Sequence, residues 1–177
     1  MRVCIDAGHG GQDSGAIGYD PFEYMEKTLN LAVANFLDER LRALEHNVIM
    51  TRRQDRYLAL DSRANFANSY GADFFVSIHA NAAANPQSEG MEVFCYPGSS
   101  SGNRAATLAL NSMLSAFPGH INRGVKEADY VVLRLTRMPA ILVECEFLTN
   151  SRQLQFLADT NNQFLLAEAI ANGIDNY

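Results

Sequence analysis

Two histidines stand where apolar, strand-like runs end, and each could present an imidazole to a ligand. His9 lies in the glycine-rich stretch DAGHGGQDSGAIG, directly after the apolar run 3–5, and His79 follows the apolar run 74–78. Functional groups of open α/β sheets gather at the carboxyl ends of the strands. The two imidazoles would therefore converge if their strands lie close together and point the same way, and such a pair is typical of a metal site.

A carboxylate would complete such a site, because hydrolytic zinc centres often combine two histidines and one acid with a water molecule in the fourth position. Glu26 is one candidate, because it opens the first amphipathic helix after the glycine-rich stretch. Glu23 competes with it on spacing alone. Glu26 also has a structural interpretation, since an acid in the first turn of a helix is favoured by the helix dipole.

The last predicted strand ends in two acids. The segment AILVECEF carries Glu144 and Glu146, whose side chains share a face if the chain is extended. A carboxylate at the end of a buried strand is costly unless it is paired, bound to metal or titratable beside a cleft. One of them is therefore a candidate general base, and the alternative, a surface acid, is favoured for Glu146. Arg134, after YVVL, would pair with a carboxylate or face substrate, whereas His46 and His120 are interpreted as surface residues.

Length and composition limit the classes of protein that the chain can belong to. It has 177 residues, enough for one domain with a real core, and 47% of them are hydrophobic. Its net charge of −6 and the absence of a basic run argue against a nucleic-acid partner. No stretch is long enough for a membrane span, and no secretory signal is recognisable. The three cysteines, an odd number in apolar runs, are expected to be buried and unpaired.

The order of predicted elements indicates a three-layer α/β domain with a mixed, largely parallel sheet. Apolar residues at spacings of three and four predict a helix from Glu26 to about residue 44. A second helix is predicted from Asp61, as N-cap, to Gly71, as the residue after the C-cap. Further helices are expected at about 103–117, 151–158 and 161–175, and strands at 2–6, 48–50, 74–78, 90–96, 130–133 and 140–143.

Five motifs together resemble those of the zinc-dependent N-acetylmuramoyl-L-alanine amidases (amidase type 3). They occur in the family's order and cover nearly the whole chain, and the set is far more specific than any one motif. The family is known for a mixed sheet of six strands, here with about five helices predicted around it. The motifs are IDAGHGGQDSGAIG, EKTLNLAVA, LDSRANFAN running into ADFFVSIHANA, RGVKEADYVVLR, and MPAILVECEFLTNS.

The resemblance implies a role for each candidate residue. His9, Glu26 and His79 match the family's zinc ligands, and Glu144 matches its catalytic glutamate, the general base that acts on zinc-activated water. The choices of Glu26 over Glu23 and of Glu144 over Glu146 come from this resemblance and not from spacing. Glu146 stands where the family usually has glycine, so it either raises the pKa of Glu144 by repulsion or points to solvent. Candidates for contact with substrate or support of the site are Arg134, Asn81 and Glu146.

The function implied by the resemblance is hydrolysis of bacterial peptidoglycan at the amide bond between N-acetylmuramic acid and L-alanine. Residues 1–177 would form a single catalytic domain with Zn²⁺ as cofactor, as a monomer or in contact with a separate wall-binding domain. The chain would reach the wall after release from the cytoplasm, as a phage endolysin does, or as part of a longer secreted autolysin. A zinc exopeptidase and a catalytically silent wall-binding module are the competing interpretations.

Overall fold

A six-stranded sheet forms the middle of three layers in the computed structural model, which describes residues 1–177. The strand order is β4-β1-β5-β8-β6-β7. The strands β4, β1, β5 and β8 run parallel, β6 runs antiparallel to β8, and β7 runs parallel to β6. The mixed, mostly parallel sheet predicted from the sequence is thus confirmed. The strands are β1 (Arg2–Ala7), β4 (Asn47–Met50), β5 (Phe74–Asn81), β6 (Met91–Cys95), β7 (Asn122–Glu127) and β8 (Ala140–Phe147).

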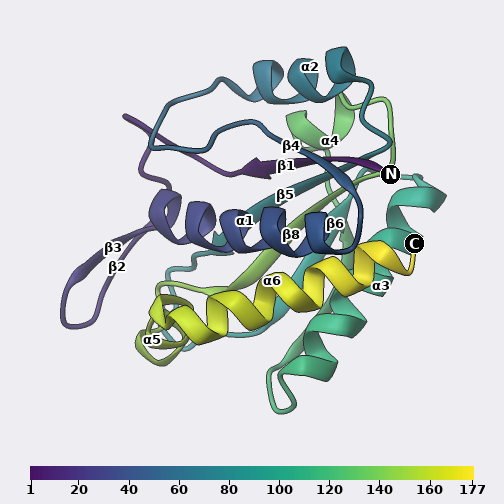
Figure 1. Cartoon of the computed structure of the whole chain (residues 1–177). Helices are drawn as coiled ribbons and strands as arrows, with labels where there is room; N and C mark the ends of the chain where they lie inside the picture. Colours follow the sequence, from purple (N-terminus) through teal and green to yellow (C-terminus); the bar gives the residue numbers. More distant parts are fainter.

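Helices cover both faces of the sheet (Figure 1). On one face, α1, α3 and α6 enclose the main core of 34 buried residues, and on the other α2 and α4 close a second core of eight. The predicted periodicity of the first helix is confirmed, since its residues Leu29, Val33, Leu37 and Leu41 are all buried. The helices are α1 (Glu26–Ala43), α2 (Leu60–Tyr70), α3 (Ser100–Ala116), α4 (Val131–Arg134), α5 (Ser151–Ala158) and α6 (Thr160–Asp175).

Some predicted elements differ from those observed. The run 130–133 is not a strand but the short helix α4, which makes six helices instead of five. The strand β7 and the hairpin of β2 (Ile17–Tyr19) and β3 (Glu23–Met25), which projects from the body in Figure 1, were not expected. The N-cap of α2 is Ala59 instead of Asp61. Gly71 ends that helix in the left-handed conformation, as the C-cap instead of the residue after it.

The two central strands extend further than their apolar runs suggest. β5 continues to Asn81 and β8 to Phe147, so His79 lies within its strand instead of after it. Between the pairs His79–Glu144 and Asn81–Phe147, β8 contains one more residue than β5 and forms a bulge. The extension brings His79 and Glu144 side by side on neighbouring strands.

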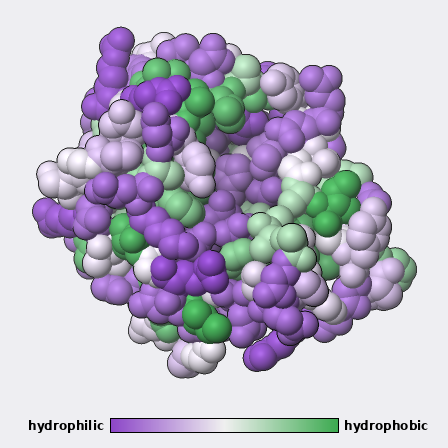
Figure 2. Space-filling view, turned by 180° about the vertical axis from the view of Figure 1, so that it is seen from behind, coloured by the Kyte–Doolittle hydropathy of each residue, from purple (hydrophilic) through white to green (hydrophobic).

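The cysteines, the helices and the surface have the character expected of a globular domain. Cys4, Cys95 and Cys145 are free and buried, as predicted. None of the helices combines the length and the apolar character that crossing a bilayer requires. Seen from behind, the surface is mostly hydrophilic, with apolar residues in separate small patches (Figure 2).

Candidate metal centre and active site

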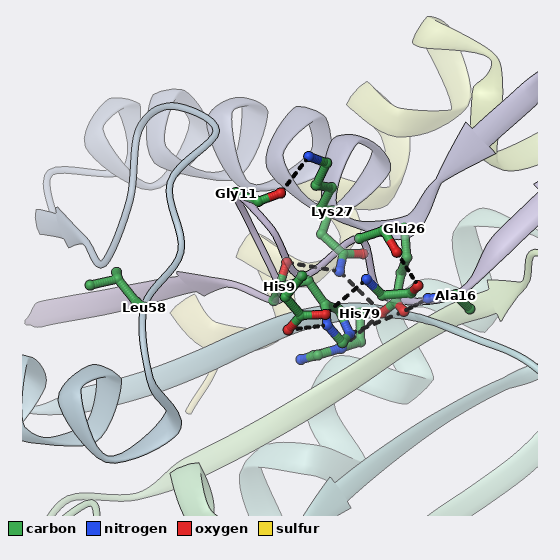
Figure 3. Close-up of polar contacts among 12 residues, drawn as sticks. His9, Gly11, Ala16, Glu26, Lys27, Leu58 and His79 are labelled. Carbon is green, nitrogen blue, oxygen red and sulfur yellow. Dashed lines mark hydrogen bonds and ion pairs between the residues drawn. The ribbon is translucent and has the colours of Figure 1, made fainter.

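Three side chains from distant parts of the sequence meet at the carboxyl ends of β1 and β5. His9 Nε2 lies 3.1 Å from one oxygen of Glu26, and His79 Nδ1 lies 2.9 Å from the other. One potential ligand atom from each residue lies within 4.8 Å of the other two. Figure 3 shows the three side chains pointing toward one another. The convergence expected of the two strand-end histidines is observed, and Glu26 lies between them.

Backbone and amide groups hold the Glu26 carboxylate in this position. The N–H of Ala16 donates to Oε2 at 3.0 Å, and the N–H of Ala80 donates to Oε1 at 3.3 Å. Asn30, one turn further along α1, donates its Nδ2 to Oε1 at 3.2 Å. The residue is only 5% exposed, so these bonds compensate for part of the cost of burying its charge. Glu23, the alternative ligand, is exposed in β3 and accepts a hydrogen bond from Tyr19 instead.

Glycines leave the space that the three side chains fill. A Cβ at Gly8 would come within 2.3 Å of the His79 ring. A Cβ at Gly15 would come within 2.5 Å of Glu26 Oε2 and 2.7 Å of His9 Cδ2. The glycines around His9 are therefore required by the close packing of these side chains as well as by the conformation of the backbone.

Asp13 was not singled out in the sequence, although it lies four residues after His9. Its carboxylate is 2.9 Å from His9 Nδ1, on the side of the ring opposite to the nitrogen that faces Glu26. A carboxylate in this position fixes the tautomer and the orientation of an imidazole, and metal-binding histidines commonly have such a partner. Asp13 thus leaves Nε2 of His9 as the nitrogen available to a ligand.

The charges in the cluster shift the pKa values of its members. Burial disfavours protonated His9, but hydrogen bonds to Glu26 and Asp13 outweigh this effect and raise its pKa to about 9. Burial also opposes protonation of His79, yet its bond to Glu26 and the charge of Glu144 raise its pKa. Burial favours the neutral form of Glu26, and its bonds to His79 and His9 overcome this and lower its pKa well below the usual range.

The donor set of the cluster fits a zinc ion. Two imidazole nitrogens and a carboxylate are ligands that Zn²⁺ prefers in catalytic sites, where a fourth position stays open. Backbone and amide groups hold Glu26, and Asp13 holds the ring of His9, so much of the cluster is pre-formed. Glu144, which pairs in register with His79, has a carboxylate oxygen, Oε2, that is buried without any hydrogen-bond partner. Buried acceptors normally have a hydrogen-bond partner, and a bound water molecule would supply one here.

Glu144 lies next to this cluster at the middle of the sheet. It pairs in register with His79 on β5 and with Glu92 on β6. Burial raises the pKa of Glu144 to about 7, an effect that Glu26 and Glu92 increase and that His79 opposes. A pKa near neutrality suits a group that must both accept and release a proton.

A cleft of about 530 Å³ opens onto these groups, with His9, His79 and Glu144 among its lining residues. Tyr57 and Leu60 stand on the side of α2, and Tyr130 and Val131 on the side of α4. The cleft is large enough for part of a glycopeptide. A substrate in it would meet the three lining groups that the sequence marked as reactive.

Glu146 is not a surface acid. It is completely buried, accepts hydrogen bonds from the N–H of Gly90 at 2.7 Å and of Phe147 at 3.1 Å, and lies 2.8 Å from His120 Nδ1. His120, predicted to be a surface residue, is partly buried instead, because its ring lies against the Glu146 carboxylate. Glu26 and Glu92, and not Glu146, are the acids that raise the pKa of Glu144.

The two other supporting candidates have partners within the chain. Asn81 donates its Nδ2 to Glu92 at 2.7 Å, and Glu92 also binds Arg123 at 2.9 Å and Lys126. Arg134 forms an exposed ion pair with Asp129 at 2.7 Å, which is one of the two outcomes expected for it. Glu92, a buried acid next to Glu144, was not recognised in the sequence.

The comparison with known families agrees with this geometry. The family model described as N-acetylmuramoyl-L-alanine amidase matches residues 3–176. The chain belongs to this amidase family. The resemblance inferred from the five motifs is thereby confirmed.

Relatives of this amidase cover its whole length. It is 39% identical to the Bacillus subtilis protein YqiI over 99% of the chain and 84% of that relative. It is 36% identical to the N-acetylmuramoyl-L-alanine amidase LytC of the same organism, again over 99% of the chain but over only 35% of LytC. The solved structure of the amidase AmiC2 of Nostoc punctiforme is 37% identical, with a TM-score of 0.94 over 100% of this chain and 96% of that chain.

The pKa shifts of the histidines predict how the stability of the metal-free amidase depends on pH. The pKa of His9 is about 9 in the folded chain and 6.5 in the unfolded chain. Protonated His9 therefore adds its full contribution to the free energy of unfolding below pH 6.5, and this contribution disappears as the pH rises to about 9. We expect urea denaturation in the presence of a chelator to show a loss on the order of 2 kcal/mol over this range. His9→Gln should flatten the dependence, and an equally steep loss in this variant would contradict the assignment.

Proposed function

We propose that this amidase hydrolyses the bond between N-acetylmuramic acid and L-alanine of peptidoglycan, with His9, Glu26 and His79 holding a zinc ion and Glu144 acting as general base. The observation that carries the proposal is Glu144 Oε2, a buried oxygen without a hydrogen-bond partner beside the three donor groups. The family explains the substrate, and the cleft that contains His9, His79 and Glu144 gives the substrate access to these groups.

The chain would provide an anionic ligand and two neutral ones. Glu26 contributes one negative charge, and Asp13 holds the ring of His9 so that Nε2 faces the site. A bound zinc ion supplies a Lewis acid that polarises the amide carbonyl and lowers the pKa of water. Because one carboxylate balances only half of its charge, the centre retains a net positive charge for the oxygen that becomes anionic during attack.

Glu144 would move the proton in both halves of the reaction. Its Oε2 is free to accept a proton from the attacking water, since it makes no bond within the chain. The same oxygen would return this proton to the nitrogen of the leaving L-alanine, which departs as a neutral amine. A divalent cation nearby favours the ionised form of Glu144, the form in which a base must start.

The wider setting of the activity is also part of the proposal. Residues 1–177 would work as one catalytic domain, either in a phage endolysin or in a longer secreted autolysin, with peptidoglycan as the partner. The exposed ion pair of Arg134 and Asp129 borders the cleft through Asp129, which suits contact with a charged stem peptide. Asn81 would act indirectly, by holding Glu92 beside Glu144.

Product analysis tests the proposal against other activities on the cell wall. Purified peptidoglycan is digested with the zinc-loaded protein, and the soluble products are identified by mass spectrometry. We expect intact stem peptides with a free L-alanine amine, and no release in the presence of a chelator. Cuts within the stem peptide would indicate a peptidase, and binding to the wall without release would indicate a silent module.

A further inference from the structure

Two buried arginines converge on the turn that carries His9. Arg52, 3% exposed, follows β4, and Arg63, 2% exposed, lies in the first turns of α2. Arg52 donates Nε to the carbonyl of Ala7 at 2.8 Å and Nη2 to that of Gly8 at 2.9 Å. Arg63 donates Nη1 to the carbonyl of Ala7 at 2.8 Å and Nη2 to that of His9 at 2.9 Å.

These bonds fix both peptide planes next to the Cα atom of His9. The carbonyl of Gly8 belongs to the plane before this atom, and the carbonyl of His9 belongs to the plane after it. The orientation of the first plane sets φ of His9, and that of the second sets its ψ. His9 has a φ of 61°, a conformation that is uncommon for residues other than glycine and that persists only when the surroundings enforce it.

We propose that Arg52 and Arg63 are positioning residues that clamp His9 in its left-handed conformation and thereby aim Nε2 at the metal centre. The inference rests on the proposed zinc site. In it, two guanidinium groups that are not ligands hold one of the ligands, His9, in its conformation. Without the clamp, the turn would relax toward ordinary φ values, and Nε2 would spend less time facing Glu26.

If only their charges mattered, Arg52 and Arg63 would weaken the binding of zinc instead of supporting it. Two cationic groups close to the donors repel a divalent cation, so on electrostatic grounds they weaken its binding. One of these charges is balanced locally, because Arg63 lies 2.9 Å from Asp6, which is itself 1% exposed and accepts bonds from Thr51 and Ser77 at 2.7 Å each. The clamp therefore predicts weaker zinc binding when an arginine is replaced, whereas repulsion alone predicts tighter binding.

The geometry of the contacts requires arginine and not merely a positive charge. Arg63 makes four hydrogen bonds, to Asp6 and to the carbonyls of Leu58, Ala7 and His9. A guanidinium group spreads five donors over a rigid plane, whereas the ammonium group of lysine is a compact charge that cannot span these acceptors. Lysine substitutions keep the charge and remove the clamp, so they separate the two effects.

The test compares R52K and R63K with the wild type and with R42K. Arg42 also donates to a backbone carbonyl, that of Val48, but on β4 and away from the metal centre. Zinc affinity is measured by competition with a chromophoric chelator, at a temperature where circular dichroism shows each protein to be folded. We expect R52K and R63K each to bind zinc about 10–100-fold more weakly than the wild type, as for other residues that orient metal ligands. R42K should lose stability without this loss of affinity.

A second readout reports on geometry directly. Cobalt(II) replaces zinc in each folded protein, and the visible absorption spectrum is recorded, because its shape depends on the arrangement of the ligands. Altered spectra in R52K and R63K and an unaltered one in R42K are expected. Wild-type zinc affinity in both clamp variants would overturn the inference, as would tighter binding. Failure of the wild type itself to bind zinc would instead overturn the proposed function.

Discussion

Replacing Glu144 with glutamine is expected to lower the turnover of purified peptidoglycan by about 10²–10⁴-fold, the usual contribution of a general base. Glutamine has nearly the same shape but cannot accept the proton of the attacking water. The three donors His9, Glu26 and His79 do not bond to Glu144, so the zinc content should stay at the wild-type level. The rate of release of soluble wall fragments and the metal content of the same sample provide the measurement.

Glu146→Gln is the matched control for this experiment. It makes the same chemical change two residues further along β8, on a side chain that is bound to Gly90, Phe147 and His120. We expect this variant to melt at a lower temperature, because a buried acceptor of several bonds is altered, while its turnover stays close to that of the wild type. Wild-type turnover in Glu144→Gln, or an equal loss of turnover in both variants, would show that Glu144 is not the base.

The order of the main elements was predictable because their patterns are strong. The helix from Glu26 shows apolar residues at helical spacing, and the run 74–78 is apolar enough to indicate a strand buried on both faces. The continuation of β5 and β8 to Asn81 and Phe147 was not predictable, because polar residues interrupt the apolar runs. These polar residues include His79 and Glu144, which belong to the proposed site.

Other elements gave misleading local signals. The segment 130–133 contains β-branched and aromatic residues, which favour a strand, but packing of α4 against α2 and β8 overrides this preference. The edge strand β7 lacks the apolar pattern by which strands are predicted, since NRGVKE is largely polar and none of its residues is fully buried. Edge strands are often charged, which hides them from a search for apolar runs.

Only part of the site could be predicted from the local pattern of residues. His9, His79 and Glu144 could be found because each follows an apolar run, whereas the preference for Glu26 and Glu144 over Glu23 and Glu146 required the family resemblance. The structure supplies physical reasons for both choices. Glu23 is exposed on the hairpin. Glu146 is bonded to Gly90, Phe147 and His120, whereas Glu144 Oε2 has no partner within the chain. Arg52, Arg63 and Glu92 were missed because charged residues are normally expected at the surface.

Replacing His79 with alanine is expected to empty the metal centre. Loss of a residue that only orients a ligand typically costs 10–100-fold in metal affinity, and loss of the ligand itself should cost at least about 100-fold. Elemental analysis after dialysis should therefore find almost no zinc, and turnover of peptidoglycan should fall with it. The fold should persist, because the side chain of His79 is partly exposed at the end of the sheet and not part of either core.

His46→Ala is the control for His79→Ala, since His46 binds Asp175 and the amino terminus and lies just before β4, at the end of the sheet opposite to the cleft. It should retain a full complement of zinc and normal turnover. A stoichiometric zinc content in folded His79→Ala would remove His79 from the ligand set. Without His79, only His9 and Glu26 of the cluster would remain, and two protein ligands are fewer than the three that hydrolytic zinc centres use. The whole proposed reaction therefore depends on the result.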